Sequence, residues 1–175
     1  MQRIVFSSFL LLLFSIGSEA QDKNEIASFL KDKRISKAAK DYYHGKFKAT
    51  DNAKTFSIVD NILTKNFQTR PFYLYLTTQI MKNSDGALSE ELGLRAKEYL
   101  EQHPDWALLF LRGNLATPSF ISIWAETIAG EIMIDCEGKE KQCAKQWYET
   151  ANKKTSTNQK QTLVDLYRQV SARCP

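Results

Sequence analysis

The stretch IWAETIAGEIMIDCEGKEKQC, residues 123–143, holds the residue types of this chain that are best suited to chemistry. Two glutamates, Glu126 and Glu131, and one aspartate, Asp135, interrupt an almost continuously apolar segment, and two cysteines follow. Paired carboxyl groups can perform general acid–base catalysis when they face one cleft in environments that separate their pKa values. The stretch is therefore either a source of catalytic carboxylates or a packed helix with one polar side.

Helical geometry favours the second interpretation. At roughly 100° per residue, Glu126 and Glu131 project about 140° apart on a helix. Each would need a catalytic partner from another helix, and the sequence does not identify one. Glu131 and Asp135 lie one turn apart, where like charges repel mildly. We expect both glutamates to be solvated polar residues, and a catalytic glutamate completed by another helix is the alternative.

Apolar residues also occur on the polar side of this predicted helix. Ile123, Met133 and Ile134 project near Glu126 and Gly130, where a surface helix should be polar. Either a second layer of helices covers that side, which is our expectation, or an apolar patch stays open for a partner. Gly130 fits the close approach of a helix or a ligand, because glycine within a helix costs about 1 kcal/mol relative to alanine. Ile123, Gly130 and Met133 are therefore candidate binding residues.

The three cysteines predict one disulfide and one remaining thiol. Cys136 and Cys143 flank Gly138, whose conformational freedom can end a helix. A disulfide between them would stabilise the protein by roughly 2.5 kcal/mol in the loop-entropy model. Pairing of Cys143 with Cys174 is the main alternative, since it would fix the C-terminal helix to the domain.

Metal binding and nucleophilic catalysis have little support in the sequence. There is no close Cys-x-x-Cys pair, and the only two histidines, His44 and His103, lie far from the cysteines. The chain also lacks a Gly-x-Ser-x-Gly motif. We therefore expect neither a metal site nor a cofactor.

A second candidate binding region lies in the sequence DYYHGKF. Tyr42, Tyr43, His44 and Phe47 place three aromatic rings and an imidazole within six residues. The simplest interpretation of His44 is the end of the first helical segment, beside a glycine. The alternative is that this cluster lines a binding surface.

The first twenty residues resemble an export signal. Arg3 precedes an apolar run over residues 4–16, and Ser18-Glu19-Ala20 is a small-x-small cleavage site. The run is too short for a membrane span of about 20 residues. We expect cleavage after Ala20, a mature domain over residues 21–175, and a periplasmic or extracellular location with no transmembrane segment.

Charge is distributed unevenly along the chain. Residues 22–54 carry nine Lys/Arg against five Asp/Glu, residues 55–136 six against ten, and residues 137–175 eight against four. Nucleic-acid-binding domains usually concentrate positive charge more strongly than this. We do not expect a nucleic-acid partner.

Hydrophobic periodicity predicts helices almost everywhere. Pro71, Pro104 and Pro118 each suit the first turn of a helix. In the predicted second helical segment, apolar residues spaced three to four apart continue as far as Phe67. Connections are short, and no linker rich in Gly, Ser or Pro divides the chain. The sequence predicts one all-α domain of seven or eight helices, packed antiparallel as a helical bundle or a short solenoid-like stack.

These features favour a protein that works by binding rather than by catalysis. We expect an exported helical protein that binds another protein, for example an inhibitor or an immunity-type protein. One alternative is a carboxylate-dependent hydrolase in which Glu126 or Glu131 acts with a residue from another helix. The other is a carrier whose apolar interior holds a small lipid-like ligand.

Overall fold

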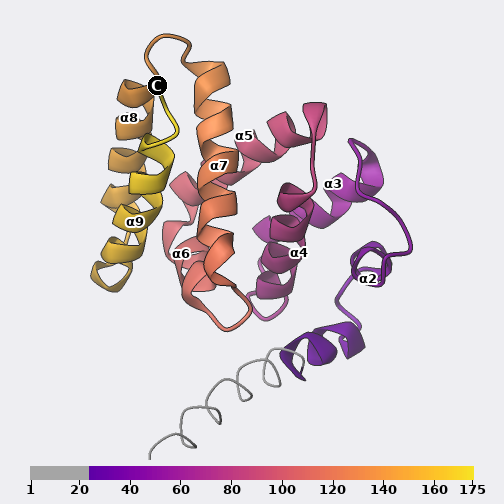
Figure 1. Cartoon of the computed structure of the whole chain (residues 1–175). Helices are drawn as coiled ribbons and strands as arrows, with labels where there is room; N and C mark the ends of the chain where they lie inside the picture. The colour runs from indigo at the N-terminus through magenta and orange to yellow at the C-terminus, as the bar shows by residue number, and fades with distance from the viewer. Residues whose placement is uncertain (1–23) are drawn as a thin grey trace, which may run out of the picture.

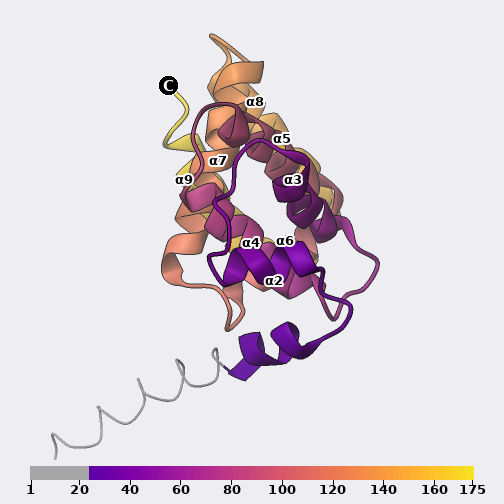
Figure 2. The same ribbon diagram turned by 90° about the vertical axis from the view of Figure 1, so that its right-hand side faces the viewer.

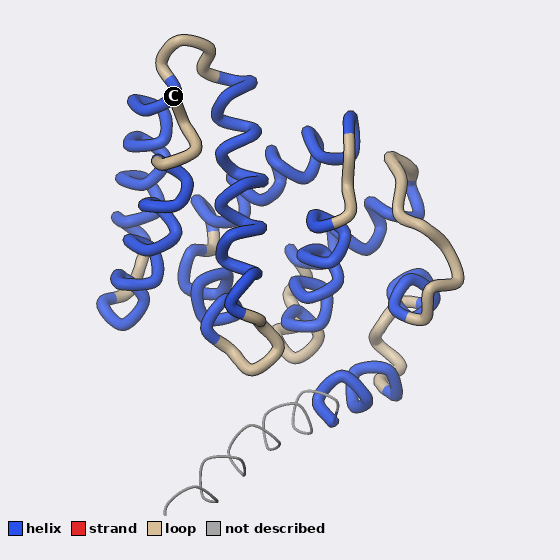
Figure 3. Tube along the Cα trace, viewed as in Figure 1, coloured by secondary structure: helices blue, strands red, loops and turns tan. Residues whose placement is uncertain are grey.

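The computed structural model describes residues 24–175, and this part of the chain is built from helices and connecting segments without a β-strand (Figures 1 and 3). The predicted signal peptide, residues 1–20, lies outside the described residues. A first helical segment covers residues 24–31. The elements that follow are α2 (Lys37–Tyr43), α3 (Ala53–Val59), the 3-10 helix η1 (Asp60–Leu63), α4 (Arg70–Lys82), α5 (Gly86–Gln102), α6 (Pro104–Arg112), α7 (Pro118–Asp135), α8 (Glu140–Lys154), the 3-10 helix η2 (Thr157–Gln159) and α9 (Lys160–Ser171).

The predicted all-α fold is confirmed. The described residues form nine α-helices, slightly more than the seven or eight expected, because residues 24–43 form two short helices. Pro71, Pro104 and Pro118 lie in the first turns of α4, α6 and α7, where a missing N–H costs no intrahelical hydrogen bond. None of the helices in the described part of the chain is long and apolar enough to cross a membrane.

Helix α7 is the centre of the domain. It packs against α4, α5, α8 and α9. Figure 1 shows α8 and α9 on one flank of α7 and α4 with α3 on the other, while Figure 2 shows the same helices after a quarter turn. Trp124 of α7 is fully buried, and its indole Nε1 donates a hydrogen bond of 2.8 Å to the hydroxyl of Thr78 on α4. The side chain therefore fixes α7 to α4 through both packing and a buried polar contact.

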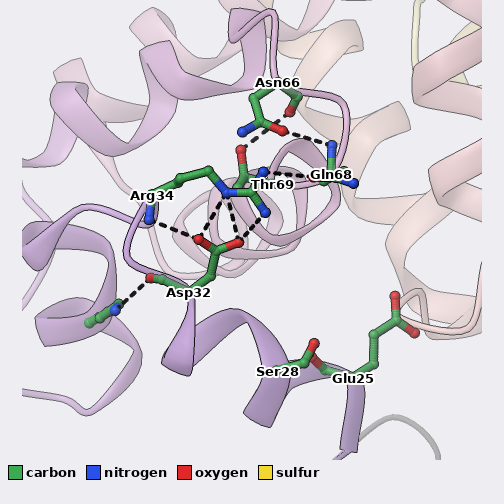
Figure 4. A network of polar contacts seen from close by, with 8 residues as sticks. Glu25, Ser28, Asp32, Arg34, Asn66, Gln68 and Thr69 are labelled. Carbon is green, nitrogen blue, oxygen red and sulfur yellow. Dashed lines mark hydrogen bonds and ion pairs between the residues drawn. The ribbon is translucent and has the colours of Figure 1, made fainter.

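The N-terminal segment is fastened to the loop before α4 by a polar network (Figure 4). The Arg34 guanidinium forms an ion pair with Asp32 and donates to the side-chain oxygen of Gln68 at 2.6 Å. Hydrogen bonds from the Arg34 side chain and backbone lower the pKa of Asp32 to about 2. Asn66 holds Gln68 in turn, because its side-chain oxygen accepts from the Gln68 backbone N–H. The first residues of the domain are thus connected to a loop more than 30 positions away.

The helix predicted to reach Phe67 ends earlier. The α-helical geometry stops at Val59, the 3-10 helix η1 stops at Leu63, and Phe67 lies in the following loop with 61% of its surface exposed. Asn52 is the N-cap of α3, and its side chain accepts from the backbone N–H groups of Lys54 and Thr55. The apolar spacing therefore extended the predicted segment by one turn too many.

Candidate functional site

An open groove of about 450 Å³ lies beside α7 and contains the candidate residues that the sequence places on that helix. Its walls come from the end of α4, the turn into α5, the first part of α5, and one side of α7. The lining residues are Met81, Lys82, Ser84, Ser89, Glu90, Ile123, Glu126, Thr127, Gly130, Glu131, Met133 and Ile134. Both candidate glutamates and all three candidate binding residues of α7 therefore lie at one site.

Helical geometry explains why two glutamates that project about 140° apart share this groove. Turning α7 at about 100° per residue places Ile123, Thr127 and Ile134 in the arc between Glu126 and Glu131. The groove covers this whole arc of the helix. The two carboxylates therefore belong to opposite edges, with mainly apolar residues between them. This arrangement suits binding of an extended ligand better than a closely spaced catalytic pair.

Glu131 is buried, which corrects the expectation that both glutamates are solvated. Its exposed fraction is 7%, whereas Glu126 is exposed. Helix α5 covers Glu131 at Gly93: a Cβ atom placed on Gly93 would lie 2.9 Å from the Glu131 Cβ and 3.2 Å from its Oε2. The missing side chain of Gly93 therefore creates the space in which the Glu131 side chain lies.

The electrostatic surroundings of Glu131 favour its protonated form. Burial raises its pKa, and the Asp135 carboxylate one turn away raises it further, as do Glu90 and Glu91 of α5. Lys97 acts in the opposite direction, but its ammonium forms an ion pair with Asp135. Within the described residues, no hydrogen-bond donor or cation pairs with the Glu131 carboxylate. The groove thus contains a buried acid that is free to receive a cation or a proton.

Polar residues at the end of α4 shape the opposite wall. The Ser84 hydroxyl donates to the backbone carbonyl of Met81 at 2.9 Å, and it also lies 2.9 Å from the hydroxyl of Ser89. These contacts connect the last turn of α4 to the first turn of α5. Hydrogen bonds of Ser84 therefore connect the two helix ends that form this wall.

The expected second layer over Ile123, Met133 and Ile134 does not form. Ile123 is partly buried, while Met133 and Ile134 expose 41% and 59% of their surfaces. Gly130 is also open, since a Cβ atom built on it would meet nothing within 4 Å. Helix α7 is central to the fold, yet this side of it faces the groove. The alternative of an open apolar patch is the one that the structure adopts.

The aromatic region at residues 42–47 is separate from the groove. The rings of Tyr42 and Phe47 lie 5.7 Å apart and are partly buried, and the Lys54 ammonium lies 3.8 Å from the Phe47 ring centre. The more exposed Tyr43 packs edge-on against His44. His44 is the C-cap of α2, as expected for the end of that helix. These four residues form two local pairs, and none of them lines the groove.

Cys136 and Cys143 form the predicted disulfide, with an S–S distance of 2.10 Å. The bond joins the end of α7 to the start of α8, close to the end of the groove at Met133 and Ile134. Cys174 is a buried free thiol, so the alternative pairing with Cys143 is not the one formed. A disulfide of this kind fits an oxidising compartment.

Within the described residues no group of three or more His, Cys, Asp or Glu side chains is arranged to hold a metal ion. Sequence reasoning missed two residues of the site, Glu90 and Gly93. It did not single out Glu90, and it assigned the close helix approach to Gly130 rather than to Gly93. Gly93 and Gly130 are both glycines within a predicted helix, so the sequence signal is the same at the two positions. Only the packing of α5 on α7 shows that the close approach occurs at Gly93.

The fold and the groove define an all-α helical domain with an open site that is both acidic and apolar. No protein-family model matches the sequence, and no curated protein or solved structure is significantly similar to it.

Proposed function

We propose that this protein is an exported binding protein that holds a segment of a partner protein in the groove beside α7. An inhibitor or immunity-type protein would work in this way. The observation that carries the proposal is the exposure of Met133 and Ile134 on the central helix of the domain. Large apolar side chains in a groove lose contact with water when a partner covers them, which stabilises a complex by about 25 cal/mol per Å² of apolar surface.

Other features of the groove support a macromolecular partner. Open apolar patches bordered by polar residues are typical of protein interaction sites, and here Glu126 and Glu131 border the apolar arc of α7. The disulfide beside the groove restrains the α7–α8 turn, so the apolar side chains are presented from a rigid element. The predicted signal peptide and the disulfide support an exported location.

The test is affinity purification of the tagged protein from its native envelope or culture fluid, with partners identified by mass spectrometry. The Ile134→Asp variant places a charge in the groove, and Leu63→Asp is a matched control because Leu63 is 52% exposed and lies outside the groove. We expect a stoichiometric partner with the original protein and with Leu63→Asp, and its loss with Ile134→Asp. A partner that Ile134→Asp retains fully would refute the proposed surface.

A carboxylate-dependent hydrolase is the second candidate function, and one observation favours it. Glu90 of α5 lines the same groove as Glu131 of α7 and contributes to its raised pKa, so another helix does supply a second carboxylate. A buried acid with a raised pKa is a common general acid. The test is a screen of chromogenic glycosides and esters. A hydrolase would lose its activity in Glu131→Gln without any loss of thermal stability, whereas a binding protein would show no turnover to lose.

A further inference from the structure

The Glu131 side chain is buried except where its carboxylate meets the groove, and the carboxylate has no partner among the described residues. Its side chain is more than nine-tenths buried, lines the groove, and neither accepts a hydrogen bond from nor pairs with any other described residue. Burying a charged group without a partner is costly, so such groups are normally paired. The ammonium that could have served, that of Lys97, is paired with Asp135. Glu131 therefore has an unused capacity to bind a cation that enters the groove.

The surrounding charges favour a positively charged ligand. Three carboxylates line the groove, those of Glu90, Glu126 and Glu131, against one ammonium, that of Lys82. Glu91 and Asp135 add negative charge near Glu131. A cation close to Glu131 would be attracted by this local excess of negative charge, and an anion would be repelled. Electrostatic complementarity of this kind selects partners and fixes their register.

The apolar arc determines what should carry the cation. Lys and Arg side chains combine a long aliphatic stem with a charged end, and they cover apolar surface with the stem while the end reaches a polar group. In the groove, Ile134 and Ile123 project about 60° and 80° from Glu131 on the same side of α7, so one long side chain can contact both kinds of surface. An inorganic ion would use only the carboxylate. The combination favours a basic side chain within an apolar segment.

We infer that the groove recognises a basic, apolar segment of the partner protein, with a Lys or Arg side chain of that segment paired to Glu131 and its apolar neighbours packed on Met133 and Ile134. This inference rests on the proposed function and adds the chemistry of the partner to it. Glu131 is the anchor for charge, and Met133 and Ile134 supply the apolar contact. Gly93 allows the arrangement, because any side chain there would occupy the space of the Glu131 carboxylate.

The test is a selection from a library of short random peptides displayed on phage, with the folded, disulfide-bonded protein as the immobilised target. Each selected peptide is then measured by calorimetry against the original protein, Ile134→Asp, Glu131→Gln and Glu149→Gln. Glu149 is exposed on α8 outside the groove, so its variant controls for the loss of one negative charge. Thermal unfolding of each variant verifies that the fold is retained.

We expect the groove-binding peptides to share a Lys or Arg flanked by apolar residues. Their Kd should rise by roughly tenfold or more in Glu131→Gln, because this variant loses a charge-assisted hydrogen bond between the basic side chain and the carboxylate. Glu149→Gln should leave the Kd unchanged, and added salt should weaken binding to the original protein more than binding to Glu131→Gln.

Two other outcomes are decisive. Peptides that lose binding in Ile134→Asp but contain no basic residue, and that bind Glu131→Gln equally well, would overturn the charge anchor while the proposed function stands. A selection in which no peptide is sensitive to Ile134→Asp would count against the groove as a binding surface, and so against the proposed function and the inference together.

Discussion

Gly93 of α5 lies directly against Glu131 of α7, and this contact joins the fold to the candidate site. A Cβ atom at position 93 would lie 2.9 Å from the Glu131 Cβ and 3.1 Å from the Thr127 carbonyl oxygen. Ordinary van der Waals contacts between such atoms need more room, so α5 approaches α7 this closely only because residue 93 is glycine. The same approach buries most of the Glu131 side chain at the edge of the groove.

Gly93→Ala should therefore destabilise the protein. The added methyl group meets backbone as well as side chain, and overpacking of this kind typically costs about 1–3 kcal/mol. The better helix propensity of alanine returns up to about 1 kcal/mol, so we expect a net loss. The measurement is urea denaturation followed by circular dichroism.

Gly130→Ala is the matched control for that substitution. Gly130 is also inside a helix, but a Cβ atom there meets nothing within 4 Å. Only the higher helix propensity of alanine then affects stability, so this variant should gain up to about 1 kcal/mol. Equal effects of the two substitutions would show that the close approach of α5 and α7 is absent in solution.

Glu131→Gln should stabilise the protein at neutral pH. Burial and the neighbouring Asp135, Glu90 and Glu91 raise the pKa of Glu131 in the folded state above its ordinary value of 4.5, while Lys97 partly opposes them. The folded state thus holds the proton more tightly than the unfolded state, so Glu131 lowers stability as the pH rises from 4.5 through the folded-state pKa. Below 4.5 both states are protonated, and the penalty disappears.

The measurement is the free energy of unfolding of both proteins at neutral pH and below pH 4.5. We expect the variant to be more stable by on the order of 1 kcal/mol at neutral pH, with the difference shrinking in acid. The Glu126→Gln control changes an exposed carboxylate of the same groove, and its effect should stay within about 0.5 kcal/mol. A difference at position 131 that grows in acid would contradict a raised pKa of Glu131 in the folded state.

Local sequence signals located the helices well because their causes are local. A proline in the first turn or a side-chain cap acts within a few residues of the helix start, as Asn52 does for α3. The end of a helix is less determined by spacing. Apolar residues up to Phe67 continue the helical period, yet the chain turns after Leu63 and leaves Phe67 in solvent.

The site was only partly predictable for a related reason. The arc of α7 that holds Ile123, Gly130 and Met133 could be identified from one helix alone, because residues of one helix share a fixed projection. The burial of Glu131 and the contribution of Glu90 depend on how α5 crosses α7, which no local pattern encodes. The unusual placement of apolar residues on a polar side was the strongest local signal of the groove.

Thr78→Val should be strongly destabilising, because it leaves a buried N–H group without an acceptor. The Thr78 hydroxyl accepts from the Trp124 Nε1 at 2.8 Å and donates to the Leu74 carbonyl at 2.8 Å, all in the fully buried core. An orphaned buried donor costs about 1–3 kcal/mol. The destabilisation by Thr78→Val should be much smaller in a Trp124→Phe background, because the N–H donor is then absent. A double-mutant cycle of unfolding free energies measures this coupling between the two residues.

Thr77→Val provides the comparison within the same turn of α4. Thr77 is also fully buried, but its hydroxyl makes no hydrogen bond with the described residues. Replacing it should be neutral or mildly stabilising, since no partner is lost. Similar losses at positions 77 and 78 would mean that the Trp124 hydrogen bond contributes little.

The disulfide between Cys136 and Cys143 should be the main covalent restraint on the α7–α8 turn beside the groove. Replacing both cysteines by serine removes a restraint on a short loop, which the loop-entropy model values at about 2.5 kcal/mol.

Cys174 is a buried thiol whose pKa is raised by burial, so it should resist alkylation in the folded protein and react after denaturation. Mass spectrometry after alkylation without reductant should therefore find no modified cysteine in the native state and one in denaturant. Three modified cysteines in denaturant would contradict the disulfide, and Cys174 modified rapidly in the native state would contradict its burial.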